Sequence, residues 1–141
     1  MPRFGEDSER ELAGVHPDLQ LVCREAIKRY DFKVICGVRS QEEQDRVYAQ
    51  GLSKVRWPGS KHNLTADCKV AWAVDLAPWP IDWSPSKVTR FFYLAGVIQT
   101  VAGILDIHVR WGHDWNMNFD FYDQKFIDAP HFELTRERYS G

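Results

Sequence analysis

Apolar residues recur along the chain with two different periods, and these periods predict its secondary structure. Between residues 17 and 30, apolar side chains return every three or four positions, as on one face of an amphipathic helix. Pro17 suits the first turn of this helix, where a backbone N–H is not needed. The next apolar run, KVICGV at 33–38, is short and β-branched and is typical of a strand.

The middle of the chain alternates structured runs with one long loop. Ser40 and Glu43 form a capping-box pattern, which predicts a helix over 41–50 that Gly51 ends. Residues 52–71 contain proline, glycine, asparagine and scattered charges, so we expect a loop. A loop of that length inside a compact domain is usually functional or disordered.

The second half adds a buried strand, a long apolar helix and two short strands. The strands are expected at 71–79, 107–112 and 131–134, and the helix from Ser84 and Pro85 to about Leu105, with an irregular aromatic stretch at 113–130 and a polar tail. Helices interleaved with a few strands, several of them late in the chain, predict an α+β fold in which a small antiparallel sheet packs with helices.

Length and composition favour one soluble domain. The chain has 141 residues, a common size for a single domain. Its 20 acidic and 18 basic residues argue against nucleic-acid binding. Polar residues and glycines interrupt the apolar stretch at 91–107, which predicts a buried helix and no membrane insertion. The polar start has no signal peptide, so we expect a cytoplasmic protein.

Histidine and carboxylate side chains are the candidates for chemistry. Asp75 lies in the apolar run AWAVDLAPW, where an isolated charge is costly unless it is paired or bound to a metal. His62 lies in the long loop. His131 follows Asp128 by three residues, and Pro130 between them favours an extended backbone.

These residue types allow ordinary explanations as well. A loop histidine is commonly a surface residue, and an aspartate in a strand commonly serves as a cap, a turn residue or an ion-pair partner. The zinc-binding patterns HExxH and CxxC do not occur in the chain. The three cysteines have no regular spacing, which argues against a disulfide framework, and Cys36 is expected to be a small core residue.

The order of several segments is more specific than any one of them. GVRSQEEQDRVYAQG is followed by SKH and AVDLAP, then RWGHDW, then DAPHFEL. From about Val34 to Leu134 this set resembles the LAS-type zinc peptidases, which include D-Ala-D-Ala carboxypeptidases and dipeptidases. It is most similar to the L-alanyl-D-glutamate endopeptidases found as phage endolysins. The resemblance implies their hedgehog/D,D-peptidase fold and a single catalytic domain over 1–141 without a separate cell-wall-binding domain.

The resemblance also implies a role for each matching residue. The Zn²⁺ ligands would be His62, Asp75 and His131. Asp128 would be the general base, and Arg39 would stabilise the developing oxyanion. Two supporting residues are implied beside them, Ser60, which shapes the ligand loop, and Asp114, which holds a ligand in place from outside.

Two departures from the family pattern stand out. The gap between His62 and Asp75 is 13 residues, where relatives usually have about seven, so Asp67 is an alternative ligand. Asp67 lacks the strand context of Asp75, which we therefore prefer. His113 stands where relatives commonly have glycine, and it either contacts substrate or fills space, with space-filling favoured.

We expect from the resemblance a monomeric zinc endopeptidase that cuts the L-Ala–D-Glu bond of the peptidoglycan stem peptide and lyses the host cell. It would be made in the host cytoplasm and would reach the wall through a pore formed by another protein. The alternatives are a D,D-carboxypeptidase or D-Ala-D-Ala dipeptidase on the same scaffold and, more remotely, a non-catalytic wall-binding module.

Overall fold

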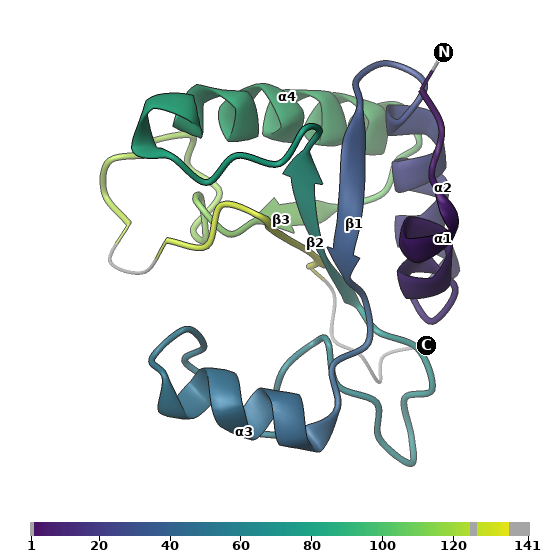
Figure 1. Cartoon of the computed structure of the whole chain (residues 1–141), viewed down its shortest axis with the longest axis vertical. Helices are drawn as coiled ribbons and strands as arrows, with labels where there is room; N and C mark the ends of the chain where they lie inside the picture. The colour runs from purple at the N-terminus through teal and green to yellow at the C-terminus, as the bar shows by residue number, and fades with distance from the viewer. Residues whose placement is uncertain (1, 125–126, 136–141) are drawn as a thin grey trace.

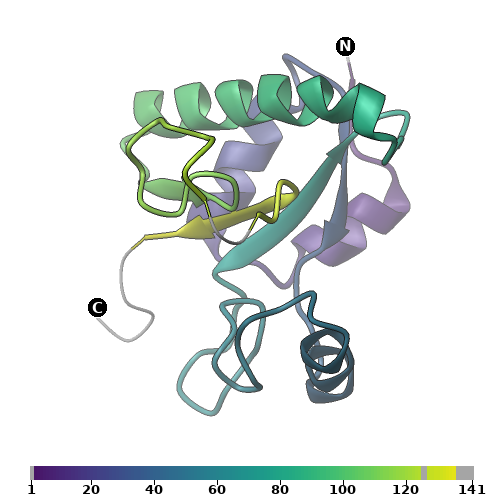
Figure 2. The same ribbon diagram turned by 90° about the vertical axis from the view of Figure 1, so that its left-hand side faces the viewer.

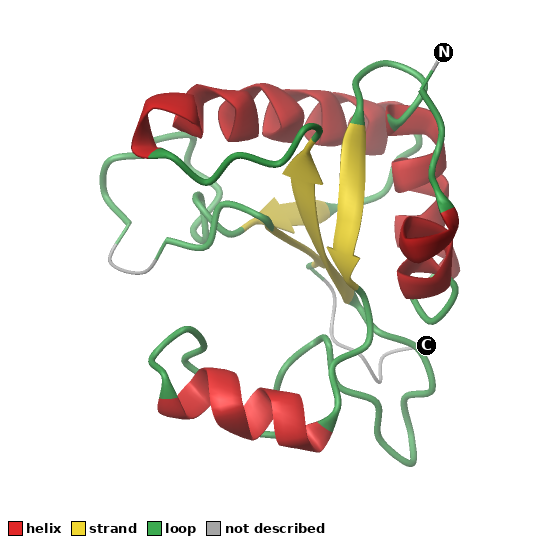
Figure 3. Ribbon diagram, in the orientation of Figure 1, coloured by secondary structure: helices red, strands yellow, loops and turns green. Residues whose placement is uncertain are grey.

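The computed structural model describes residues 2–124 and 127–135. The elements follow one another along the chain as α1 (Glu6–Leu12), α2 (Pro17–Ala26), β1 (Phe32–Cys36), α3 (Gln41–Ala49), β2 (Ala73–Pro78), the 3₁₀ turn η1 (Pro85–Lys87), α4 (Val88–Ile104), β3 (Val109–Trp111) and β4 (His131–Leu134). Figure 3 distinguishes the helices, the strands and the long connections between them.

Within the described residues, the sheet has four strands in the order β1-β2-β4-β3, and every neighbouring pair is antiparallel. The last strand in sequence, β4, therefore lies inside the sheet, between β2 and β3. This architecture confirms the predicted α+β class.

Most of the helical residues cover the sheet, while one helix stands apart. In Figure 1, α4 lies across one end of the strands and α1 and α2 lie beside β1. Their buried side chains, among them Leu12, Leu19, Val22, Leu94 and Ile98, form one core with the apolar residues of the strands. Figure 2 shows α3 and the loop after it on the far side of the sheet from α4. Among the described residues, no helix combines the length and apolar composition needed to cross a bilayer.

The predicted elements are all present, most of them with somewhat different bounds, and one helix was missed. The helix expected over 17–30 ends at Ala26, and the strand expected at 71–79 runs from Ala73 to Pro78. The missed helix is α1, because its seven residues are mostly polar and only Ser8 and Leu12 are buried. Most of the expected polar tail, 136–141, lies outside the described residues.

The long loop between α3 and β2 is fastened at several points. The backbone N–H of Trp72 donates to the Lys61 carbonyl at 2.7 Å, and that of Ala71 donates to the Gly14 carbonyl at 2.9 Å. The side-chain amide of Asn63 donates to the Arg39 carbonyl at 3.1 Å. These bonds fix the segment that carries His62 against the chain just before α3 and the chain just before β2, which is itself bound to the connection between α1 and α2.

Candidate functional site

Three side chains from distant parts of the chain meet at the end of β2. His62 Nε2 lies 3.2 Å from Asp75 Oδ1 and 3.2 Å from His131 Nδ1, and His131 Nδ1 lies 3.3 Å from Asp75 Oδ1. His62 and His131 are buried, and the Asp75 side chain is only 13% exposed. The structure thus brings together the three residues that the sequence comparison indicated as ligands.

The sheet and the fastened loop hold these residues in place. Asp75 on β2 and His131 on β4 are register partners, so their side chains lie on the same face of the sheet. His62 comes from the loop, where its backbone N–H donates to Ser60 Oγ at 3.1 Å and its carbonyl accepts from Arg39 N–H at 2.9 Å. Ser60 thus contacts the backbone of His62 in this loop.

The outer nitrogens of both imidazoles are fixed by acceptors. His62 Nδ1 lies 2.8 Å from the Gly37 carbonyl oxygen, and His131 Nε2 lies 2.8 Å from Glu133 Oε1. A carbonyl can only accept, so His62 Nδ1 carries a proton; the Glu133 carboxylate favours the same for His131 Nε2. The two inner nitrogens are then left with lone pairs that face each other and Asp75.

This donor set fits a tetrahedral metal ion. Zinc bonds of about 2.0–2.1 Å to nitrogen and oxygen place neighbouring donor atoms about 3.3–3.4 Å apart. The three observed separations, 3.2, 3.2 and 3.3 Å, are close to that value. Two lone pairs and a carboxylate oxygen at this spacing repel one another unless a cation lies between them. An outer carboxylate on a ligating histidine is also common in zinc sites.

The pKa shifts of the three clustered side chains also indicate that the cluster favours a bound cation. Burial opposes the charged form of both histidines, yet the Asp75 carboxylate, joined by Glu133 at His131, outweighs burial and raises the pKa of His62 and of His131 to about 9. Burial likewise opposes ionisation of Asp75, but the adjacent His62 and His131 hold its pKa well below the usual range. Without a metal, protons are therefore the cations that this cluster retains.

Asp128 lies beside the cluster. One of its carboxylate oxygens is within 4.8 Å of ligand atoms of Asp75 and His131. Its backbone is fixed at both sides, since Asp128 N–H donates to the Gly112 carbonyl at 2.8 Å and the Asp128 carbonyl accepts from His131 N–H at 3.0 Å. Burial, together with the charge of Asp75, raises the pKa of Asp128. A raised pKa favours a part for this carboxyl group in proton transfer.

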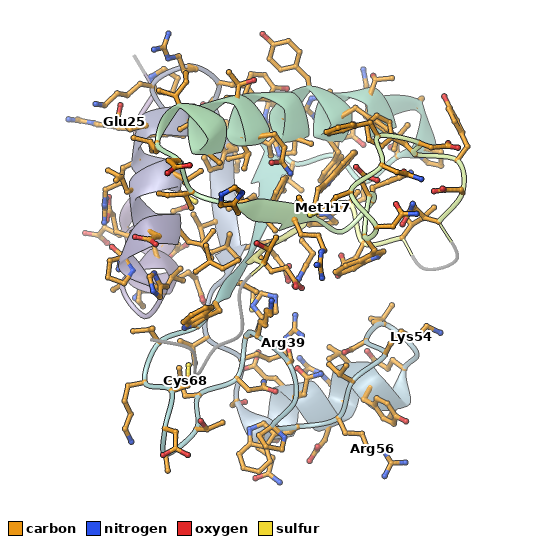
Figure 4. The ribbon with its side chains drawn as sticks, turned by 180° about the vertical axis from the view of Figure 1, so that it is seen from behind. Glu25, Arg39, Lys54, Arg56, Cys68 and Met117 are labelled. Atoms are coloured by element: carbon orange, nitrogen blue, oxygen red, sulfur yellow. The ribbon has the colours of Figure 1, made fainter. Side chains whose placement is uncertain are left out.

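Arg39 binds the outer oxygen of Asp75. Its Nη2 donates to Asp75 Oδ2 at 3.2 Å, and its Nη1 donates to Gln44 Oε1 at 3.1 Å. Gln44 is fully buried on α3, so α3 anchors the arginine. Figure 4 shows Arg39 between the sheet and α3, with Lys54 on the loop that follows α3. Arg39 therefore reaches the site, and in this structure it orients a candidate ligand.

The outer partner of His131 is Glu133, which the sequence analysis missed. Glu133 also forms an ion pair with Lys61 at 3.0 Å. Burial would raise its pKa, but His131 and Lys61 lower it to about 2. The signal available in the sequence was the spacing of two in HFEL, which places both side chains on one face of a strand.

Asp114 has a different position from the one expected of a residue that holds a ligand. Its carboxylate accepts from the backbone N–H groups of Asn118 and Phe119, at 3.2 and 3.1 Å, and so orders the turn that follows β3. His113 is buried and stacks on Trp111 with ring centroids 5.1 Å apart, which agrees with the space-filling interpretation.

Two further residues remain from the sequence analysis, Asp67 as the alternative ligand and Cys36 as an expected core residue. Asp67 is exposed in the loop, away from the cluster that contains Asp75. Cys36 is half-buried rather than a core residue, and its Sγ lies 3.9 Å from the outer nitrogen of His62. This position could not be predicted from the sequence, because β1 ends there with an irregular register against β2.

A cavity of about 430 Å³ opens over the cluster. Its walls come from the loop after α3, from the ligand loop, and from β3 and β4. They include Arg39, Lys61, Arg110, Trp115 and Asp128. Trp115 packs beside the candidate ligand His131, with ring centroids 5.3 Å apart. The arrangement offers a metal position, a carboxyl group and several cations to one bound substrate.

Comparisons with known proteins agree on one family. A family model described as phage L-alanyl-D-glutamate peptidase matches residues 1–135. The L-alanyl-D-glutamate peptidase of Escherichia phage T5 is 32% identical over 141 residues, covering 94% of this chain and 98% of that protein. The crystal structure of the L-Ala D-Glu endopeptidase ChiX of Serratia marcescens is similar with a TM-score of 0.71 and 28% identity, covering 95% of this chain and 91% of that one.

Proposed function

Because the chain belongs to the family of phage L-alanyl-D-glutamate peptidases, we propose that it hydrolyses the L-Ala–D-Glu bond of the peptidoglycan stem peptide and that it does so with zinc. The proposed ligands are His62, Asp75 and His131. The observation that carries this proposal is the spacing of their three donor atoms, 3.2 to 3.3 Å, which suits a tetrahedral ion.

The chemistry divides between the ion and the protein. A bound zinc ion lowers the pKa of water and polarises a carbonyl group. Asp128 accepts the proton of the attacking water and later delivers it to the leaving amine of D-glutamate. Burial and the charge of Asp75 support this role, because they raise the pKa of Asp128 and so favour return of the proton.

Arg39 has two tasks in this proposal. Its contact with Asp75 Oδ2 at 3.2 Å holds the carboxylate so that Oδ1 faces the histidines. Its position in the cavity wall supports the second task, stabilisation of the developing oxyanion by its positive charge. Ser60 supports His62 through its backbone N–H.

Peptidoglycan is the substrate class that this family membership implies. That the protein is a monomer, binds no nucleic acid and reaches the wall through a pore made by another protein stays a prediction. The single catalytic domain over 1–141, without a separate cell-wall-binding domain, also stays a prediction.

Digestion of purified peptidoglycan tests the proposal. The zinc-loaded protein is incubated with it, and the new termini are identified by mass spectrometry. New N-terminal D-Glu is the expected product. Released D-Ala would instead indicate a D,D-carboxypeptidase, and binding to the wall without any new terminus would indicate a non-catalytic module. Chelator treatment should abolish the products, and added zinc should restore them.

A further inference from the structure

Arg110 lines the cavity over the candidate metal site, and its guanidinium has a hydrogen-bond donor that is not used within the described residues. Its Nε–H is buried and has no acceptor among the described residues. Its nearest carboxylate oxygen, Glu133 Oε2, is 3.7 Å from Nη1, which is too long for a hydrogen bond. One third of the side chain remains exposed. Folded proteins rarely leave a buried donor unpaired, and such a group in a cavity wall often serves a ligand.

The sheet places Arg110 at a defined distance from the metal position. Arg110 on β3 and Glu133 on β4 are register partners, as are Asp75 on β2 and His131 on β4. His131 and Glu133 are two residues apart, so all four side chains lie on one face. Two residues along a strand span about 7 Å. The backbone of Arg110 is therefore offset along the strands by about 7 Å from the candidate ligands, a distance that the long arginine side chain can bridge toward a substrate residue beside the metal position.

Arg110 has a longer ion pair than Arg39 and Lys61, two other cations of the cavity wall. Arg39 is paired with Asp75 at 3.2 Å, and Lys61 is paired with Glu133 at 3.0 Å. Glu133 also holds His131 with its other oxygen at 2.8 Å. The single charge of Glu133 is thus shared among His131, Lys61 and Arg110, so it neutralises Arg110 only in part.

We propose that Arg110 is a specificity-determining residue that binds the free carboxylate of the glutamyl residue on the amine side of the cleaved bond. This inference rests on the proposed function. D-Glutamate has two carboxyl groups, and only one of them continues the peptide chain, so the other is free beside the scissile bond. An arginine can bind such a group through two parallel hydrogen bonds.

A pair of synthetic stem peptides tests this assignment. The two peptides are identical except that the free carboxylate of D-glutamate is a carboxamide in the second. We expect the zinc-loaded wild-type protein to cleave the carboxylate peptide with a kcat/KM about 10- to 100-fold above that of the carboxamide, mainly through KM, as for loss of a charge-assisted contact. Arg110→Gln should lose this ratio by slowing the carboxylate peptide alone, and Arg110→Lys should keep part of it.

The ratio of the two kcat/KM values distinguishes recognition of the carboxylate by Arg110 from a merely structural role of this residue. If Arg110→Gln slows both peptides equally, or if the wild-type protein does not discriminate, the assignment is wrong. Lys54→Gln removes the same charge from the same cavity and should retain the wild-type ratio. An equal loss in Lys54→Gln would mean that general attraction, rather than contact with Arg110, selects the substrate. If the wild-type protein cleaves neither peptide at the Ala–Glu bond, the proposed function itself fails.

Discussion

At the scale of single residues, groups outside the metal position determine how its ligands are presented. Gly37 and Glu133 accept hydrogen bonds from the outer nitrogens of the two histidines, and Arg39 holds the second oxygen of Asp75. Each inner donor atom is thereby oriented before a metal arrives. Such outer partners typically contribute 10- to 100-fold to metal affinity.

Glu133→Gln should therefore weaken zinc binding by about 10- to 100-fold, because an amide is a weaker acceptor for the His131 N–H. Competition titration against a chelator of known affinity measures the change. Glu42→Gln, an exposed substitution on α3 with the same loss of charge, should leave the affinity unaltered. Equal affinities in wild-type protein and Glu133→Gln would remove Glu133 from the metal site.

Asp128 and His131 should separate metal binding from catalysis. His131→Ala is expected to lose both zinc and activity, because it removes a ligand. Asp128→Asn should keep its zinc and lose at least about 100-fold in kcat, as for the loss of a general base. Elemental analysis and assays of stem-peptide cleavage provide the two measurements. Full activity in Asp128→Asn would exclude Asp128 from the mechanism.

At the scale of elements, the sequence predicted what depends on local periodicity and missed what depends on pairing. The apolar periods located α2, α4 and β2, and the capping box located the start of α3 at Gln41. The strand order was not predictable, since β4 pairs with β2 across more than 50 residues of chain. The role of Glu133 escaped for the same reason, because it depends on Lys61 from a distant loop and on the side-chain direction along β4.

The site residues themselves were indicated mainly by the order of motifs. Local chemistry made Asp75 conspicuous and left His62 and His131 ambiguous. The 13-residue gap between His62 and Asp75 was the weak point, and the structure accommodates it in a loop fastened at both ends. Position within the fold, rather than spacing in the sequence, identifies Asp75 instead of Asp67 as the candidate ligand.

Gly112 permits the close approach of two elements. A Cβ at this position would lie 2.1 Å from the Asp128 carbonyl oxygen and 3.0 Å from His131 Cβ. Gly112→Ala should therefore push the segment with Asp128 away from β3, destabilise the protein by about 2 kcal/mol or more, and lower kcat. Urea unfolding and assays of stem-peptide cleavage measure both effects.

Gly96→Ala is the matched control for this substitution. Gly96 is exposed on α4, and an added Cβ would meet no atom within 4 Å. The change should stabilise the protein by about 0.5–1 kcal/mol through helix propensity and leave kcat unchanged. If Gly112→Ala behaves in the same way, the close approach at Asp128 has no energetic importance.

At the scale of the whole molecule, the cluster couples stability to pH. In the metal-free protein, obtained by treatment with a chelator, His62 and His131 each have a pKa of about 9, against an ordinary value of 6.5. Their contribution to stability is complete below pH 6.5 and is lost as pH rises toward 9. Glu133, with a pKa lowered to about 2 from 4.5, contributes above pH 4.5 and loses its effect as pH falls toward 2.

The free energy of unfolding of the metal-free protein should therefore fall as the pH rises from about 6.5 to 9. Urea unfolding at successive pH values measures this change. With zinc present the alkaline decrease should disappear, because zinc binds the neutral imidazoles and stabilises the native state by mass action. A metal-free protein that gains stability from pH 6.5 to 9 would contradict the raised pKa values of His62 and His131.

The internal position of β4 has a consequence for timing during synthesis. The strand that carries His131 leaves the ribosome after β1, β2 and β3, yet it fills the gap between β2 and β3. A nascent chain that stops before it lacks a ligand and leaves the facing edge of β2 without its partner. Hydrolytic activity should therefore begin only when translation of this region is complete, so that premature fragments do not attack the wall.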